Sequence, residues 1–177
     1  MNLPNLLTCL RILMVPVILV LLARGEYGAA MWLVLAAGVT DVLDGFIARR
    51  FGLATYLGAL LDPLADKILI VSAVVVLARS GLVPWWLAAA VIGRDLVILG
   101  GAAAWYRKAR RLDMEPTLLS KANTFVQITL VYLVIAHGAG LIRIAPLLPV
   151  LFILALVTTV VSGIHYVAVW GGRARTL

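Results

Sequence analysis

The sequence predicts an all-α integral membrane protein in which six transmembrane helices surround a polar cavity that faces the cytoplasm. Of its 177 residues, 64% are hydrophobic and the mean hydropathy is +1.10, well above the roughly half-apolar usage of soluble domains. Glycine and proline divide the chain into segments of about the length that a bilayer requires. Several segments contain ionisable residues, which must face protein or water because lipid cannot solvate them.

The first three helices are predicted at 5–23, 28–50 and 54–79. Gly25 and Gly28 separate the first from the second, and Gly52 separates the second from the third, because glycine interrupts regular helix. The second and third helices contain charged residues, so they can span a membrane only if those residues face the interior.

The last three helices are predicted at 84–107, 118–138 and 146–170. Pro84, Pro116 and Pro146 mark their starts. Only the fifth and sixth helices lie within stretches of about 20 residues free of Lys, Arg, Asp and Glu, at 122–142 and 144–172. No soluble extension or linker is apparent, so we expect a single domain over 1–177.

Basic residues predict the orientation. The loops after the second and fourth helices, with the C-terminus, contain Arg49, Arg50, Arg107, Lys108, Arg110, Arg111, Arg173 and Arg175, whereas the opposite loops contain only Arg24, Arg79 and Arg143. By the positive-inside rule both termini are cytoplasmic. The net charge of +7 then reflects topology and anionic headgroups, and we expect no nucleic-acid partner.

Four aspartates, Asp41, Asp44, Asp62 and Asp66, are half of the eight acidic residues. Spacings of three and four residues place each pair on one helical face. Asp44 and Asp62 lie at similar depths, roughly 12–15 Å from the turn near Gly52 at about 1.5 Å per residue. Four carboxylates converging between two antiparallel helices would suit a hard divalent cation.

The segment around these aspartates reads Asp41-x2-Asp44-Gly45-x2-Ala48-Arg49-x8-Gly58-x3-Asp62-x3-Asp66. In this motif the chain resembles the CDP-alcohol phosphatidyltransferase family. Asn5-Leu6-Leu7-Thr8-x2-Arg11 and Asp62-Pro63-Leu64-Ala65-Asp66-Lys67 are similar to the branch that contains phosphatidylglycerophosphate synthases and CMP-forming cardiolipin synthases. Arg94-Asp95 and Ser120-Lys121-x-Asn123-Thr124-x2-Gln127 look closer to the cardiolipin synthases, and the acceptor stays open.

The resemblance implies an enzyme of phospholipid biosynthesis that transfers a phosphatidyl group from CDP-diacylglycerol to a primary hydroxyl and releases CMP. The acceptor would be phosphatidylglycerol, giving cardiolipin, or glycerol-3-phosphate, giving phosphatidylglycerophosphate. One or two Mg²⁺ or Mn²⁺ ions, a homodimer and a bacterial inner membrane, with the active site on the cytoplasmic side, are also implied.

The resemblance also assigns residues. Metal ligands would be Asp41, Asp44, Asp62 and Asp66, and Asp66 would also be the catalytic base. Contacts to the CDP group would come from Thr8, Arg11, Gly45, Ala48, Arg49 and Gly58. Independently of the resemblance, Lys121, Thr124 and Gln127 recur every three residues, on or near one face of the fifth predicted helix. With Arg94 and Arg107 they are candidates for contacts to an anionic acceptor.

Two alternatives remain at this point. Arg94 and Asp95 could be structural partners inside the membrane, and because adjacent residues do not face one another on a helix, such pairing is expected with other helices. The Asp cluster could instead belong to a small divalent-cation transporter or channel. A cation pathway would need polar residues in the outer half of the membrane, where the first four helices are mostly aliphatic apart from Thr40.

Overall fold

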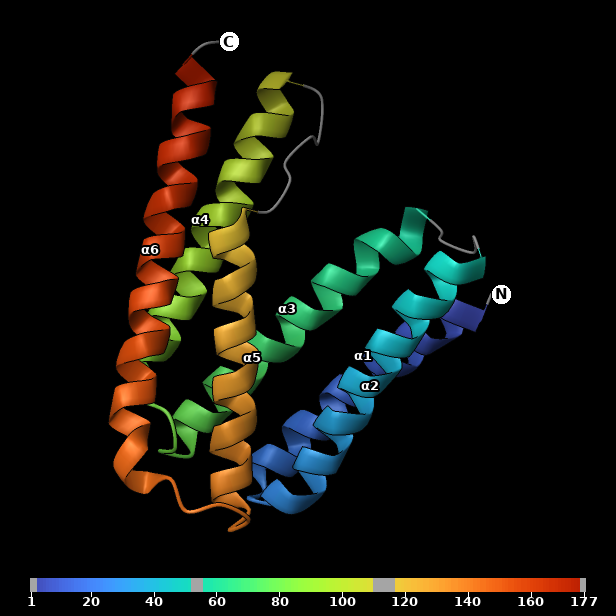
Figure 1. The fold of residues 1–177 in the computed structure, drawn as a ribbon, viewed down its shortest axis with the longest axis vertical. Helices are drawn as coiled ribbons and strands as arrows, with labels where there is room; N and C mark the ends of the chain where they lie inside the picture. Colours follow the sequence, from blue (N-terminus) through green and yellow to red (C-terminus); the bar gives the residue numbers. More distant parts are fainter. Residues whose placement is uncertain (1–2, 52–55, 110–116, 176–177) are drawn as a thin grey trace. The chain divides into compact units, whose positions relative to one another are not determined.

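The computed structural model describes residues 3–51, 56–109 and 117–175, with side chains for 13–40, 67–101 and 117–169. The described residues are helical, without strands (Figure 1). The elements are α1 (Leu3–Ala23), α2 (Tyr27–Phe51), α3 (Tyr56–Arg79), α4 (Trp85–Ala109), α5 (Leu118–Gly138), the short 3-10 helix η1 (Ala145–Leu147) and α6 (Leu148–Arg175). All six predicted helical segments are confirmed, and α6 continues to Arg175, beyond its predicted end at residue 170.

The helices form two compact units, which are described separately. The first contains Met1–Leu82 and Val131–Ile144, that is, α1, α2, α3 and the end of α5. The second contains Val83–Leu130 and Ala145–Leu177, that is, α4, the beginning of α5, η1 and α6.

In the first unit, α1 packs against both α2 and α3. Its inward face is formed by Val15, Ile18 and Leu22, and the last two are completely buried. On α3, Leu77 is also completely buried. The spacing of three and four residues on α1 is that of an amphipathic helix whose apolar stripe faces a neighbour.

A glycine in the left-handed conformation ends α1. Gly25 has φ of 76°, and the amide of the following Glu26 donates to the carbonyl of Leu21 at 2.9 Å. This is the Schellman arrangement, in which the reversed turn satisfies carbonyls that the helix leaves free. The same pattern recurs after α3 and α5, where Gly81 and Gly140 have φ of 77° and 73°.

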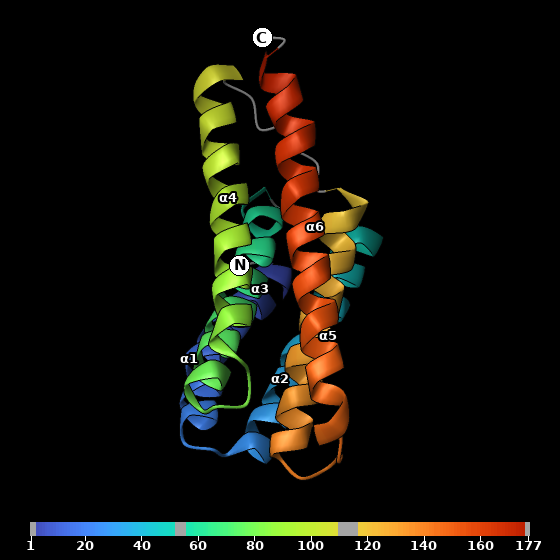
Figure 2. The same ribbon diagram turned by 90° about the vertical axis from the view of Figure 1, so that its left-hand side faces the viewer.

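In the second unit, α4 and α6 lie side by side (Figure 2). Leu87, Val91 and Ala155 are buried in this unit. Further along the two helices, the hydroxyl of Tyr166 on α6 donates to the carbonyl of Ile98 on α4 at 3.1 Å. A Cβ atom at Gly101 would lie 2.9 Å from the Tyr166 ring, so glycine lets α4 and this aromatic side chain approach closely.

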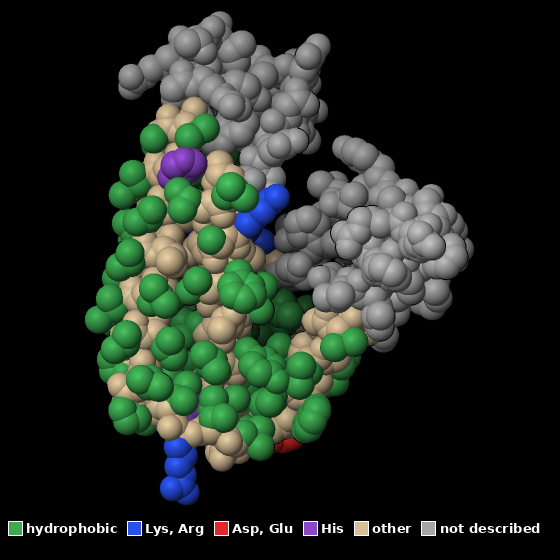
Figure 3. All heavy atoms as spheres, in the orientation of Figure 1, with side chains coloured by type: hydrophobic (Ala, Val, Ile, Leu, Met, Phe, Trp, Pro, Cys, Tyr) green, Lys and Arg blue, Asp and Glu red, His purple; other side chains and the backbone are tan. Residues whose placement is uncertain are grey.

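Many aliphatic side chains of the described residues are exposed. Hydrophobic side chains cover most of the described part of the face shown in Figure 3, and exposed members on α6 include Val150, Ile153, Val157 and Ile164. Within the described residues, two helical segments are long and apolar enough to cross a membrane, Leu118–Gly138 and Ala145–Val169. A soluble domain would instead place mostly polar residues on such helix faces.

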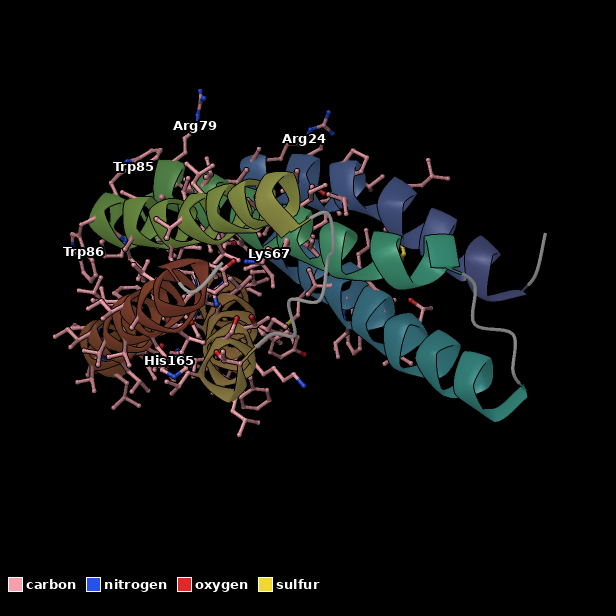
Figure 4. The ribbon with its side chains drawn as sticks, turned by 90° about the horizontal axis from the view of Figure 1, so that it is seen from above. Arg24, Lys67, Arg79, Trp85, Trp86 and His165 are labelled. Atoms are coloured by element: carbon pink, nitrogen blue, oxygen red, sulfur yellow. The ribbon has the colours of Figure 1, made fainter. Side chains whose placement is uncertain are left out.

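Residues at the expected non-cytoplasmic helix ends point outward. Figure 4 shows Arg24 and Arg79 extending away from the helices, and Trp85 and Trp86 at the start of α4 are 60% and 48% exposed. Tryptophan and arginine at helix ends are typical of the membrane–water interface, where an amphipathic side chain contacts both phases.

Replacing Gly25 by alanine is expected to destabilise the protein, because a side chain at positive φ costs about 1–2 kcal/mol. Gly28, three positions along, lies in helix α2 with open space around it, so Gly28→Ala should be neutral or stabilising by up to about 1 kcal/mol. The apparent Tm of the two variants in detergent micelles measures the difference. Equal Tm values would show that the turn at Gly25 does not constrain the fold.

Candidate functional site

The four predicted metal ligands lie on two consecutive helices. Asp41 and Asp44 belong to α2, and Asp62 and Asp66 belong to α3. The backbone is continuously helical at these positions, so each pair does share a helical face. Their side chains lie outside the described residues, and the convergence of the four carboxylates remains a prediction. Where side chains are described, no three His, Cys, Asp or Glu residues form a group that could hold a metal.

The predicted CDP contacts also lie on helices, α1 for Thr8 and Arg11, α2 for Gly45, Ala48 and Arg49, and α3 for Gly58. Their side chains are likewise not described, and the same is true of Arg107 on α4. These assignments therefore remain predictions.

The three acceptor candidates of α5 differ in exposure. Lys121 is exposed, Thr124 is half-buried and Gln127 is buried. The Thr124 hydroxyl donates to the carbonyl of Ser120 at 3.0 Å. Because three residues fall short of a 3.6-residue turn, successive members of the series are displaced around the helix. Lys121, with no ion pair to a described residue, is the one whose charge is available to a ligand.

Arg94 lies at the centre of a polar cluster that joins α4, α5 and α6. Its side chain is almost fully buried, with 5% of the residue exposed. Nη1 donates to Oδ1 of Asp95 at 2.7 Å. Nη2 donates to the hydroxyls of Ser120 on α5 and Ser162 on α6, at 2.6 and 2.9 Å. Three hydrogen bonds, one of them to a carboxylate, therefore compensate the guanidinium for its removal from water.

We expected Arg94 and Asp95 to pair only with residues of other helices, and for their ion pair this prediction is wrong. The guanidinium forms an ion pair with its chain neighbour at 2.7 Å. Backbone directions separate the two Cβ atoms, but the long arginine side chain can turn back along the helix and reach the carboxylate. The expectation holds for the neutral partners, because Ser120 and Ser162 belong to α5 and α6.

A second polar cluster links α5 to α6 within the same unit. Nε2 of Gln127 donates to the hydroxyl of Thr159 at 3.1 Å, and that hydroxyl donates to Oδ1 of Asn123 at 3.0 Å. Thr159 is 1% exposed and Asn123 is 0% exposed. Each oxygen is thus used inside the protein, as buried polar groups require. Among the described residues, three buried side-chain nitrogens have no hydrogen-bond partner: Nε of Arg94, Nδ2 of Asn123 and Nδ1 of His165.

Sequence reasoning missed Thr159 and Ser162 on α6. The signal was the presence of hydroxyl side chains, Thr158, Thr159 and Ser162, in an otherwise aliphatic helix. Small hydroxyl residues in apolar helices commonly form interhelical hydrogen bonds. Which helix they face depends on packing, so their partners could not be read from the sequence.

Comparison with known proteins shows that the sequence of this chain matches one protein family. The family model described as CDP-alcohol phosphatidyltransferase matches residues 1–168. A protein of Mycobacterium tuberculosis named probable phosphatidylglycerophosphate synthase is 38% identical, over 94% of this chain and 80% of its own length. A probable CMP-forming cardiolipin synthase of Drosophila melanogaster is 37% identical, over 94% of this chain and 57% of its own. The CDP-diacylglycerol–glycerol-3-phosphate 3-phosphatidyltransferase of Bacillus subtilis is 30% identical over 93% of both.

Thr159→Val should destabilise the protein by about 1–2 kcal/mol, because it leaves the buried amides of Asn123 and Gln127 without their shared partner. Thr158→Val is the matched control, since that hydroxyl donates at 3.1 Å to Ala155 of its own helix. The apparent Tm in detergent should fall for Thr159→Val and change little for Thr158→Val. A similar Tm for both would exclude a stabilising role for the cluster.

Proposed function

The chain belongs to the CDP-alcohol phosphatidyltransferase family, and from this premise we propose that it transfers the phosphatidyl group of CDP-diacylglycerol to a glycerol-based acceptor alcohol. The reaction releases CMP and serves phospholipid biosynthesis. The observation that carries this conclusion is the intact motif from Asp41 to Asp66, whose aspartates, glycines, Ala48 and Arg49 lie on α2 and α3. The match over residues 1–168 includes five of the helices and most of α6, so the support extends well beyond this motif.

Either glycerol-3-phosphate or phosphatidylglycerol fits the acceptor role. Relatives named for both products have nearly the same identity to this chain, 38% and 37%. Both acceptors present a primary hydroxyl near a phosphate group. A cationic contact to that phosphate and a base beside the hydroxyl would serve either one.

We propose that Asp41, Asp44, Asp62 and Asp66 hold the divalent metal that enzymes of this family generally use, as one or two Mg²⁺ or Mn²⁺ ions. Carboxylate oxygens are the donors that such hard cations prefer. When bound, the metal would neutralise the pyrophosphate and polarise its phosphoryl oxygens.

Asp66 is proposed as the general base. Its carboxylate would take the proton from the acceptor hydroxyl as that oxygen attacks the β-phosphorus of CDP-diacylglycerol and CMP leaves. The remaining requirement of phosphoryl transfer is to orient the two substrates and neutralise their charge.

Residues around the aspartates would accommodate and orient the substrates. For the CDP group these are Thr8, Arg11, Gly45, Ala48, Arg49 and Gly58. For the acceptor phosphate, Lys121 and Arg107 are the favoured cations, since Lys121 is exposed and without an ion pair to a described residue. Contacts from Arg94, Thr124 and Gln127 remain predicted, although both terminal nitrogens of Arg94, the hydroxyl of Thr124 and Nε2 of Gln127 already donate to protein oxygens.

For the membrane arrangement, we propose six spanning helices in one domain around a polar cavity open to the cytoplasm. The excess of basic residues in alternate loops supports cytoplasmic termini, and the two apolar segments in α5 and α6 support spanning. A bacterial inner membrane and a homodimer complete the proposal. No specific observation favours the transporter alternative, and the three relatives described above are named for lipid synthesis or phosphatidyl transfer.

Asp44→Asn is expected to abolish CMP release from CDP-diacylglycerol, because an amide is a much weaker ligand for a hard cation than a carboxylate. The measurement is one incubation of purified protein with CDP-diacylglycerol and Mn²⁺ for each acceptor separately, with lipid products identified by mass. Removing the metal with a chelator should have the same effect as the substitution.

The matched control is Glu26→Gln, which removes another acidic group from an exposed position outside the helices. This variant should retain wild-type CMP release. Full activity of Asp44→Asn would refute the metal-site assignment, and Mg²⁺ flux through sealed proteoliposomes without CMP release would favour the transporter.

A further inference from the structure

The positive charge of Arg94 is already compensated by other groups of the protein. Both terminal nitrogens donate to protein oxygens, at 2.6 to 2.9 Å, and the residue is 5% exposed. Phosphate recognition by arginine commonly uses these same terminal N–H groups in a bidentate geometry. The remaining nitrogen, Nε, has no hydrogen-bond partner but is fully buried, so an acceptor phosphate could reach the guanidinium only if the surrounding protein groups moved.

The first turn of α5 is fixed at two points. At its start, the hydroxyl of Thr117 accepts a hydrogen bond from the amide of Ser120 at 3.2 Å, which is the geometry of a helix N-cap. The same turn is also held by a neighbouring helix, because the Ser120 hydroxyl accepts a hydrogen bond from Nη2 of Arg94 on α4 at 2.6 Å. The next residue is Lys121, which is exposed and has no ion pair with a described residue.

Side chains, more than backbone contact, join α5 to the rest of its unit. The close backbone packing among the described residues of this unit is between α4 and α6. The contacts that tie α5 to these helices include Ser120 to Arg94 and Asn123 to Thr159. Removing the first contact should therefore loosen the start of α5 while leaving α4 against α6.

We propose that Arg94 is a positioning residue: by holding Ser120, its guanidinium fixes the first turn of α5 and so orients Lys121 toward the anionic acceptor. This inference rests on the proposed function, because it takes Lys121 to contact the acceptor phosphate. Asp95 neutralises Arg94, so the cluster supplies rigidity and Lys121 supplies the charge. Pre-organising a flexible lysine in this way lowers the entropy lost when it binds a phosphate.

The test compares Ser120→Ala, Lys121→Ala and the double variant in purified protein, with whichever of glycerol-3-phosphate or phosphatidylglycerol the wild type uses. Ser120→Ala should raise the apparent KM for the acceptor about 5- to 20-fold, since small misplacements of binding groups have effects of this order or larger. The apparent KM for CDP-diacylglycerol should not change. In the double variant the acceptor KM should equal that of Lys121→Ala, because Ser120 acts only through the lysine.

Two further variants separate positioning from general loss of structure. Thr129→Ala removes a hydroxyl from an exposed position of the same helix, where it donates to Phe125 at 2.8 Å, and it should leave both KM values unchanged. Ser120→Thr retains a hydroxyl and should restore the acceptor KM to near the wild-type value.

An unchanged acceptor KM in Ser120→Ala, or independent and multiplying effects in the double variant, would overturn the inference while the transferase activity stands. A parallel rise in the KM of both substrates would also overturn it, since that indicates a structural role alone. A wild-type protein that releases no CMP with either acceptor would instead refute the proposed function, and this inference with it.

Discussion

A charged or polar side chain within an apolar helix is tolerated only where another group satisfies it, and this requirement organises the second unit of the protein. Arg94, buried in α4, donates hydrogen bonds to Asp95 of its own helix and to hydroxyl groups of α5 and α6. The hydroxyl of Thr159 on α6 likewise links Gln127 and Asn123 of α5 through two hydrogen bonds. In lipid, water cannot replace these partners, so the polar contacts determine which helix faces must meet.

The same requirement distinguishes charge used for structure from charge available to substrate. The guanidinium of Arg94 is enclosed and paired with a carboxylate, whereas Lys121, one residue beyond Ser120, is exposed. A basic residue in a membrane enzyme with an anionic substrate is easily assigned to binding from its type alone. Its hydrogen-bond partners give a better criterion, because a cation already compensated by the protein gains little from a second anion.

Glycines determine the local geometry in a complementary way. After α1, α3 and α5 a glycine at positive φ reverses the chain and satisfies the last carbonyls. Within α4, Gly101 instead provides space for the Tyr166 ring. The first role follows from the absence of a Cβ at positive φ and the second from the small volume of glycine.

The helices and the family could be predicted from the amino-acid sequence alone. Apolar segments interrupted by glycine and proline located six helices, because helix periodicity and breakers act locally, and the motif from Asp41 to Asp66 identified the chemistry. The partners of Arg94, Gln127 and Asn123, in contrast, could be assigned only from the packing of the helices. Those partners come from residues far apart in sequence, and a long side chain such as arginine can bond a chain neighbour that helix geometry alone would exclude. The exposure of Lys121 and the burial of Gln127 likewise depend on which side of α5 meets its neighbours, a choice made by packing across helices.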